Sequence, residues 1–95
     1  MTPSIRSVTP ISATRLVLVY GNGERRAFDV GPLLDIGRFS ELKDESLFKA
    51  VRVSFDTVEW PNGLDIDPEE LYAGSVAMEG DVAEEPPSYG RARRI

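Results

Sequence analysis

The chain has neither cysteine nor histidine among its 95 residues. Without cysteine there is no disulfide framework, no thiol nucleophile and no thiolate metal site. Without histidine the chain lacks the commonest general base near neutral pH and the commonest metal ligand. Serine–histidine–aspartate and cysteine–histidine catalytic arrangements are therefore excluded. We expect a protein that is not an enzyme and that binds no cofactor or metal.

Long apolar runs are also missing. No stretch approaches the ~18 apolar residues of a membrane span, and the N-terminus lacks the basic-then-apolar layout of a secretory signal. These features predict a cytoplasmic protein without membrane contact. The length suits one domain.

Charge is unevenly distributed, with a net value of −5. Residues 1–30 carry four arginines against two acidic residues, whereas residues 31–75 carry four basic and ten acidic residues. An acidic middle disfavours broad contact with phosphate backbones, which depends on Lys and Arg. We therefore do not expect nucleic acid to be the main partner.

Apolar and turn residues predict an N-terminal three-stranded antiparallel meander over residues 5–9, 16–20 and 24–30. The pair Asn22-Gly23 favours a two-residue type I′ turn, which would place Val17 opposite Phe28. A three-residue loop over residues 21–23 is the alternative, and it would place Leu16 opposite Phe28. We favour the first register.

The second half predicts short helices, a second hairpin and a final helical turn. A helical turn is expected at residues 31–35, interrupted by Gly37, and a helix at residues 44–50 with Asp44 as its N-cap. Alternation over residues 51–56 places Val53 and Phe55 on one face. A hairpin turns at residues 61–63, and Asp67 caps a helix that ends at Gly74.

The fold class is therefore α+β, with residues 1–76 as a single domain. Residues 77–95 contain Pro, Glu and Arg with little apolar periodicity, and we expect them to form a flexible tail.

Two sets of carboxylates have spacings that suit a chemical site. Asp65, Asp67 and Glu69 have a spacing that can ligate Mg²⁺ or Ca²⁺, but helix capping and solvent exposure explain them better. Glu59 and Asp65 flank the second turn and can face each other across it like an acid–base pair. Acids on the wet side of a hairpin are the simpler interpretation.

Aromatic and basic residues offer candidate contact surfaces. The aromatic residues Tyr20, Phe28, Phe55, Trp60 and Tyr72 are expected mainly in the core, although an exposed Trp60 would suit a partner contact. Arg6, Arg15, Arg25 and Arg26 either protect a strand edge or grip an acidic protein or phosphates. The candidate partner contacts are Arg25, Arg26, Trp60, Asp65 and Tyr72.

Several of these motifs together resemble one small bacterial family, domain of unknown function 2442, over about residues 3–76. They are, in chain order, Ile5-x-Ser7-Val8-x-Pro10, Asn22-Gly23-Glu24-Arg25-Arg26-x-Phe28-Asp29-Val30, Pro32-Leu33-Leu34, Leu47-Phe48-x-x-Val51 and Trp60-Pro61-Asn62-Gly63-x-Asp65-x-Asp67-Pro68-x-x-Leu71-Tyr72. The resemblance implies a small α+β fold without assigned catalytic residues. It also implies, for some members, an antitoxin-side role beside a small toxin-like protein, and for others a C-terminal helix-turn-helix. The sequence after Val76 is too short here for such a bundle.

We therefore expect a non-enzymatic protein-interaction module, the antitoxin-side partner of a small basic toxin-like protein. A homodimer through a strand edge is a further expectation. The alternative is a regulatory protein that contacts nucleic acid through Arg6, Arg15, Arg25, Arg26 and the tail residues Arg91, Arg93 and Arg94.

Overall fold

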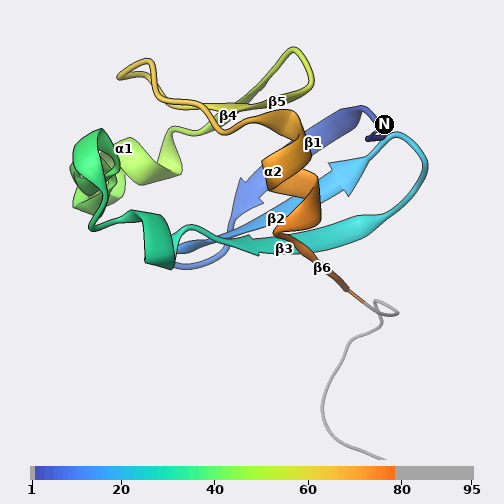
Figure 1. Ribbon diagram of the computed structural model, residues 1–95, viewed down its shortest axis with the longest axis horizontal. Helices are drawn as coiled ribbons and strands as arrows, with labels where there is room; N and C mark the ends of the chain where they lie inside the picture. The colour runs from blue at the N-terminus through green and yellow to red at the C-terminus, as the bar shows by residue number, and fades with distance from the viewer. Residues whose placement is uncertain (1, 79–95) are drawn as a thin grey trace, which may run out of the picture.

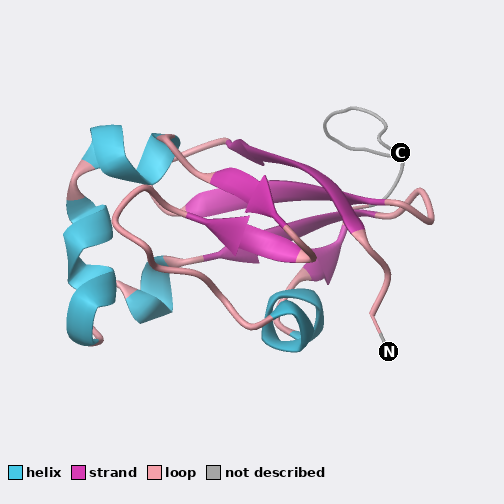
Figure 2. Ribbon diagram, turned by 90° about the horizontal axis from the view of Figure 1, so that it is seen from above, coloured by secondary structure: helices cyan, strands magenta, loops and turns pink. Residues whose placement is uncertain are grey.

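The apolar run at residues 16–20 forms a central strand of a four-stranded antiparallel sheet in the computed structural model, which describes residues 2–78. In this sheet the strand order is β1-β2-β3-β6, and a separate hairpin joins β4 to β5. Figures 1 and 2 show the helices gathered at one end of the sheet and across one face. The fold is α+β, as predicted. The elements are β1 (Ile5–Pro10), β2 (Arg15–Tyr20), β3 (Arg25–Asp29), η1 (Gly31–Leu33), η2 (Gly37–Lys43), α1 (Glu45–Lys49), β4 (Arg52–Ser54), β5 (Thr57–Glu59), α2 (Pro68–Ala73) and β6 (Val76–Ala77).

The register favoured from the sequence for the first hairpin is wrong. Leu16, not Val17, lies opposite Phe28. The Tyr20 N–H donates to the Glu24 carbonyl and the Gly23 N–H to the Tyr20 carbonyl, both at 2.9 Å, so the loop has three residues. Such a loop needs one residue in the left-handed region, and Gly23 supplies it with φ +94°. This register also turns Leu16 and Phe28 to the same buried face.

The turn at residues 61–63 repeats this design. The Trp60 N–H donates to the Leu64 carbonyl at 2.9 Å, and Gly63 has φ +90°. Beyond it the pairing is limited to one bridge between Glu59 and Asp65. The full partner of β5 is β4, through pairs such as Val53 with Val58. The predicted second hairpin is thus a turn with a single bridge.

Phe55 does not share the inward face of Val53. The pairing of Ser54 with Thr57 leaves only Phe55 and Asp56 to reverse the chain. A two-residue hairpin turn requires positive φ at its first central position, and Phe55 adopts φ +55°. Its side chain is 98% exposed. The predicted alternation was wrong here because the chain reverses one residue earlier than the pattern suggested.

Both predicted helix caps are confirmed. The Asp44 carboxylate accepts from the Leu47 N–H at 3.2 Å, and α1 begins at the next residue. The Asp67 carboxylate accepts from the N–H groups of Glu69 and Glu70 at 3.1 and 3.2 Å. Each carboxylate satisfies amide groups that have no partner within the first helical turn.

Strand β6 was not predicted. Val76 and Ala77 pair with Ala27 and Arg26 of β3, and the Met78 N–H donates to the Arg25 carbonyl at 2.8 Å. The sheet therefore extends one residue past the expected domain boundary at 76. The tail was expected over residues 77–95, and its part from residue 79 onward lies outside the described residues.

A single core fills the space between the sheet, the helices and the β4–β5 hairpin. Trp60 is fully buried in it, and its indole N–H donates to the Phe48 carbonyl at 3.0 Å. Trp60 therefore has no exposed surface for a partner, which corrects its assignment as a contact residue. None of the helices between residues 2 and 78 is long and apolar enough to cross a bilayer. The buried core residues are Ile5, Leu16, Leu18, Tyr20, Phe28, Val30, Leu42, Phe48, Val58, Trp60, Ile66 and Leu71.

Candidate interaction surfaces

Arg26 occupies a core-facing position of β3, two residues before the buried Phe28. A charge placed there must be paired, because desolvating it alone is costly. Its Nε donates to the Ser75 hydroxyl at 2.5 Å and a terminal nitrogen donates to the Ser75 carbonyl at 3.0 Å. The other terminal nitrogen lies 3.6 Å from the Glu24 carboxylate. These contacts fasten the segment after α2 to the central sheet.

Tyr72 completes this polar cluster. The Arg26 guanidinium lies over its ring, 4.3 Å from the centroid, and its hydroxyl donates to Glu24 Oε1 at 2.7 Å. The hydrogen bond to the Glu24 carboxylate favours the protonated phenol and raises the pKa of Tyr72. Two predicted contact residues, Arg26 and Tyr72, thus meet in a structural network.

Tyr20 lies behind Tyr72, with the rings edge-to-face and their centroids 5.2 Å apart. Burial raises the pKa of Tyr20. Its hydroxyl is buried and has no hydrogen-bond partner among the described residues. The sequence did not indicate this cluster, because its members come from two distant stretches of the chain, residues 20–26 and residues 72–75.

The remaining predicted contacts do not converge on one surface. Arg25 points to the opposite face of β3 from Arg26 and is exposed. Asp65 is also exposed, beside the single bridge to Glu59. The Glu59 carboxylate accepts from Arg52 at 3.2 Å, so its nearest charged partner is a cation of the neighbouring strand.

The four N-terminal arginines do not form one basic patch. Arg6 lies near the first turn, on the side where Gly21 approaches β1. Arg15 lies opposite Asp29 in the strand register, at the other end of β2 from the first turn. Val19, which lies opposite Arg25, is about 13 Å further along β2. Since Arg26 is already held by Ser75 and Glu24, a shared phosphate-binding surface would have to use separated side chains. The tail arginines Arg91, Arg93 and Arg94 lie outside the described residues.

The acidic spacing at residues 65–69 does not assemble a metal centre. Within residues 2–78 no group of three acidic side chains is placed to hold a metal ion. Asp67 uses its carboxylate to cap α2.

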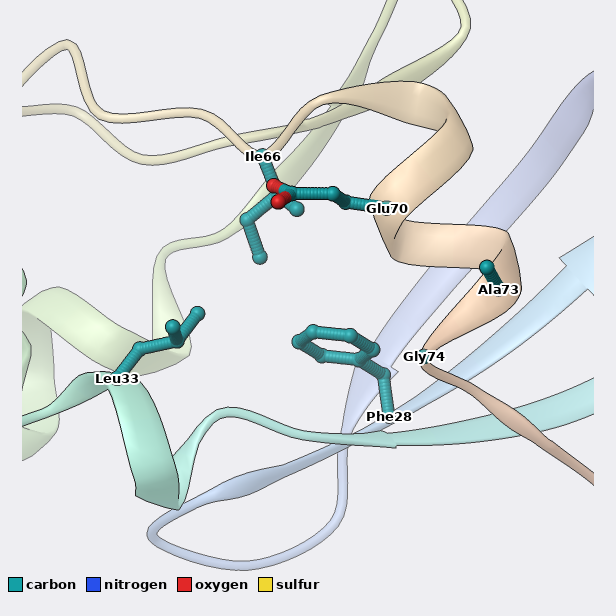
Figure 3. A pocket seen from close by; sticks show the side chains of 6 residues that line it. All are labelled: Phe28, Leu33, Ile66, Glu70, Ala73 and Gly74. Carbon is teal, nitrogen blue, oxygen red and sulfur yellow. The ribbon is translucent and has the colours of Figure 1, made fainter.

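An apolar cleft of about 420 Å³ lies between α2 and the start of the helical segment. Figure 3 shows the ring of Phe28 and the side chain of Leu33 facing this space, with the carboxylate of Glu70 at its upper edge. The cleft exists partly because Gly74 lets the chain pass close to Phe28, where an added Cβ would sit 2.9 Å from the ring. A C-terminal glycine after α2 was expected, but the cleft was not. Its lining residues are Phe28, Leu33, Ile66, Glu70, Ala73 and Gly74.

Acidic residues outnumber basic ones over residues 31–78. Every Lys and Arg between residues 31 and 78 already faces a carboxylate, in the pairs Arg38–Glu41, Lys43–Asp35, Lys49–Glu45 and Arg52–Glu59. The Asn62 amide and Arg38 also donate to Glu41, and they lower the pKa of its carboxyl. Within the described chain, Glu69 and Glu70 at the start of α2 have no such cation. The carboxylate of Glu70 therefore stands at the edge of the cleft without a Lys or Arg of residues 31–78 paired with it.

Comparison with protein families gives a match over residues 5–77 to the model described as "Protein of unknown function (DUF2442)". The chain belongs to this family. Searches of curated proteins and of solved structures find no significant match. The family match therefore confirms the resemblance of the ordered motifs, and its description assigns no function.

Proposed function

We propose that this DUF2442 protein is a non-enzymatic cytoplasmic interaction module that covers a small basic protein, as the antitoxin side of a toxin–antitoxin pair does. The observation that carries the proposal is the apolar cleft beside α2 with the carboxylate of Glu70 at its edge. Glu70 lines this cleft, and no Lys or Arg of the described chain pairs with it. A segment of the partner in which an apolar side chain is followed by a Lys or Arg would complement both the apolar lining and the Glu70 carboxylate.

The mechanism is occlusion. An apolar residue of the partner enters the space between Phe28 and Leu33, which removes apolar surface from water. The adjacent cation of the partner then meets Glu70 at the rim, and the complementary charges guide association. A functional surface of the partner covered in this way is unavailable to its own target.

The first test is co-purification of the tagged chain after co-expression with the reading frames that neighbour it. We expect a small basic protein in stoichiometric amount, which is toxic when expressed alone and harmless in the presence of this chain. Recovery of the chain by itself, or of a partner whose toxicity is unaffected, would contradict the proposal.

A charge reversal tests whether the cleft is the site. Glu70→Lys should weaken binding of the recovered partner by about tenfold or more, because it places like charges at the rim. Glu45→Lys is the matched control, since Glu45 is also an acid in the first turn of a helix but lies on α1. Equal effects of the two substitutions would argue against the cleft.

The salt dependence of binding distinguishes the nucleic-acid alternative from the proposed function. Binding to duplex DNA that collapses as salt rises, and that is lost on replacing Arg6, Arg15 and Arg25 with Ala, would support it instead.

A further inference from the structure

The β4–β5 turn carries a side chain that the fold does not use. Phe55 is 98% exposed, and it contributes nothing to the core. Figure 1 shows this turn projecting from the body of the molecule. An exposed phenylalanine at the end of a projection presents its whole ring to a partner.

The backbone of Phe55 makes its presence costly as well. Among the described residues other than glycine, it alone has positive φ, at +55°. Glycine or asparagine would fit this position with less strain. A bulky residue in a strained conformation that gains no burial points to a role outside the fold.

The residues around Phe55 hold the turn firmly. The Thr57 hydroxyl donates to the Ile66 carbonyl, and the next residue, Val58, is fully buried. Arg52 and Glu59 are paired across the hairpin at 3.2 Å. Because the support is already ordered, a partner that takes up the ring does not have to pay for ordering the hairpin.

We propose that Phe55 anchors the β4–β5 turn in an apolar pocket, beside a Lys or Arg, on the basic partner protein. This inference rests on the proposed function and adds a second contact, separate from the cleft. Asp56 is exposed next to Phe55 and supplies the charge that a basic rim would meet. A fully desolvated aromatic anchor of this kind is typical of the residues that dominate protein interfaces.

Charge also argues against two other occupants. If Phe55 entered the cleft of a second copy, Asp56 would approach the carboxylate of Glu70, and each copy carries a net charge of −5. An anionic membrane surface would likewise repel Asp56 and the net negative charge.

The test places the photo-crosslinking residue p-benzoylphenylalanine at position 55 of the full chain, co-expressed with its neighbouring reading frames. The matched control carries it at Ile36, which is also an exposed apolar residue. We expect position 55 alone to form an adduct with the basic partner, mapped by mass spectrometry to an apolar segment next to a Lys or Arg. An adduct with a second copy, with lipid or with an acidic protein would overturn the inference, as would the absence of any adduct from position 55.

Binding measurements give a second readout. Phe55→Ala and Phe55→Asn should each lower the affinity for the purified partner by about 30-fold or more. Phe55→Trp should retain most of that affinity. Because asparagine tolerates the positive φ of this position, a loss of binding in Phe55→Asn cannot be attributed to misfolding of the turn. Ile36→Ala should change affinity less than twofold. If the partner binds normally to both Phe55 variants, the anchor is wrong while the proposed function stands; if no basic partner exists, both are wrong.

Discussion

The Arg26 guanidinium lies 4.3 Å from the centre of the Tyr72 ring, although 46 positions separate the two residues in the sequence. Their contact joins the central sheet to α2, and Glu24 binds both side chains. Two residues that looked like surface contacts are therefore part of the framework that holds α2 over the sheet. This framework positions the cleft, because Gly74 follows directly from α2.

Removing Arg26 should be costly. Arg26→Ala loses two hydrogen bonds to Ser75 and the stacking on Tyr72, and we expect the free energy of unfolding to fall by about 2–3 kcal/mol. Urea unfolding followed by circular dichroism measures the change. Arg15→Ala is the control, because Arg15 is exposed on the neighbouring strand and should cost less than about 0.5 kcal/mol. Similar losses for both variants would show that the cluster does not hold α2.

Stability should decline at alkaline pH. The pKa values of Tyr20 and Tyr72 are both raised above the ordinary value of 10 in the folded protein. The unfolded chain therefore loses these protons first, so stability is complete below about pH 10 and falls as the pH rises toward the folded pKa values. Urea unfolding between pH 8 and 11.5 should show this decline, and absorbance at 295 nm should show two tyrosines ionising late.

Tyr20→Phe separates the contribution of the buried hydroxyl. Because this hydroxyl has no partner among the described residues, its removal should change stability at pH 7 by less than about 0.5 kcal/mol. The alkaline decline should become shallower. An unchanged decline would mean that Tyr20 is not one of the groups responsible.

Local signals in the sequence predicted the fold class and the helix starts. Asp44 and Asp67 precede the first helical turn, where a carboxylate satisfies amide groups that lack partners, and this chemistry is local. The motifs also predicted the family. Trp60, in contrast, was placed correctly among the expected core residues but wrongly among the contacts, because exposure depends on the packing of distant segments.

The register of the first hairpin, strand β6 and the cleft could not be predicted from local sequence patterns. Both Asn22-Gly23 and a three-residue loop are compatible with a hairpin, and burial of Leu16 with Phe28 decides between them. Strand β6 has only two residues, so it carries no periodic signal. The cleft required knowing that Gly74 lies against Phe28, a contact between segments 46 residues apart.

Filling the space at Gly74 should destabilise the protein. A Cβ there would lie 2.9 Å from the Phe28 ring and 3.0 Å from the Glu70 carbonyl, closer than ordinary contacts. Gly74→Ala should therefore lower the free energy of unfolding by about 1–3 kcal/mol, despite the better helix propensity of alanine. Gly21→Ala is the matched control, since its Cβ would meet the nearest atom at an ordinary 3.4 Å. If Gly74→Ala is as stable as Gly21→Ala in urea unfolding, the close approach to Phe28 is wrong.

Replacing Phe55 should have the opposite effect on stability. Asn adopts the left-handed region more readily than Phe, and the exposed ring gives up no buried contacts. Phe55→Asn should therefore raise the free energy of unfolding by about 0.5–1 kcal/mol, measured by urea unfolding. Phe55→Ala keeps a side chain unsuited to this conformation and should gain less. A loss of stability in Phe55→Asn would show that the ring supports the fold, whereas a gain accompanied by weaker partner binding would mean that the chain retains a strained residue for recognition.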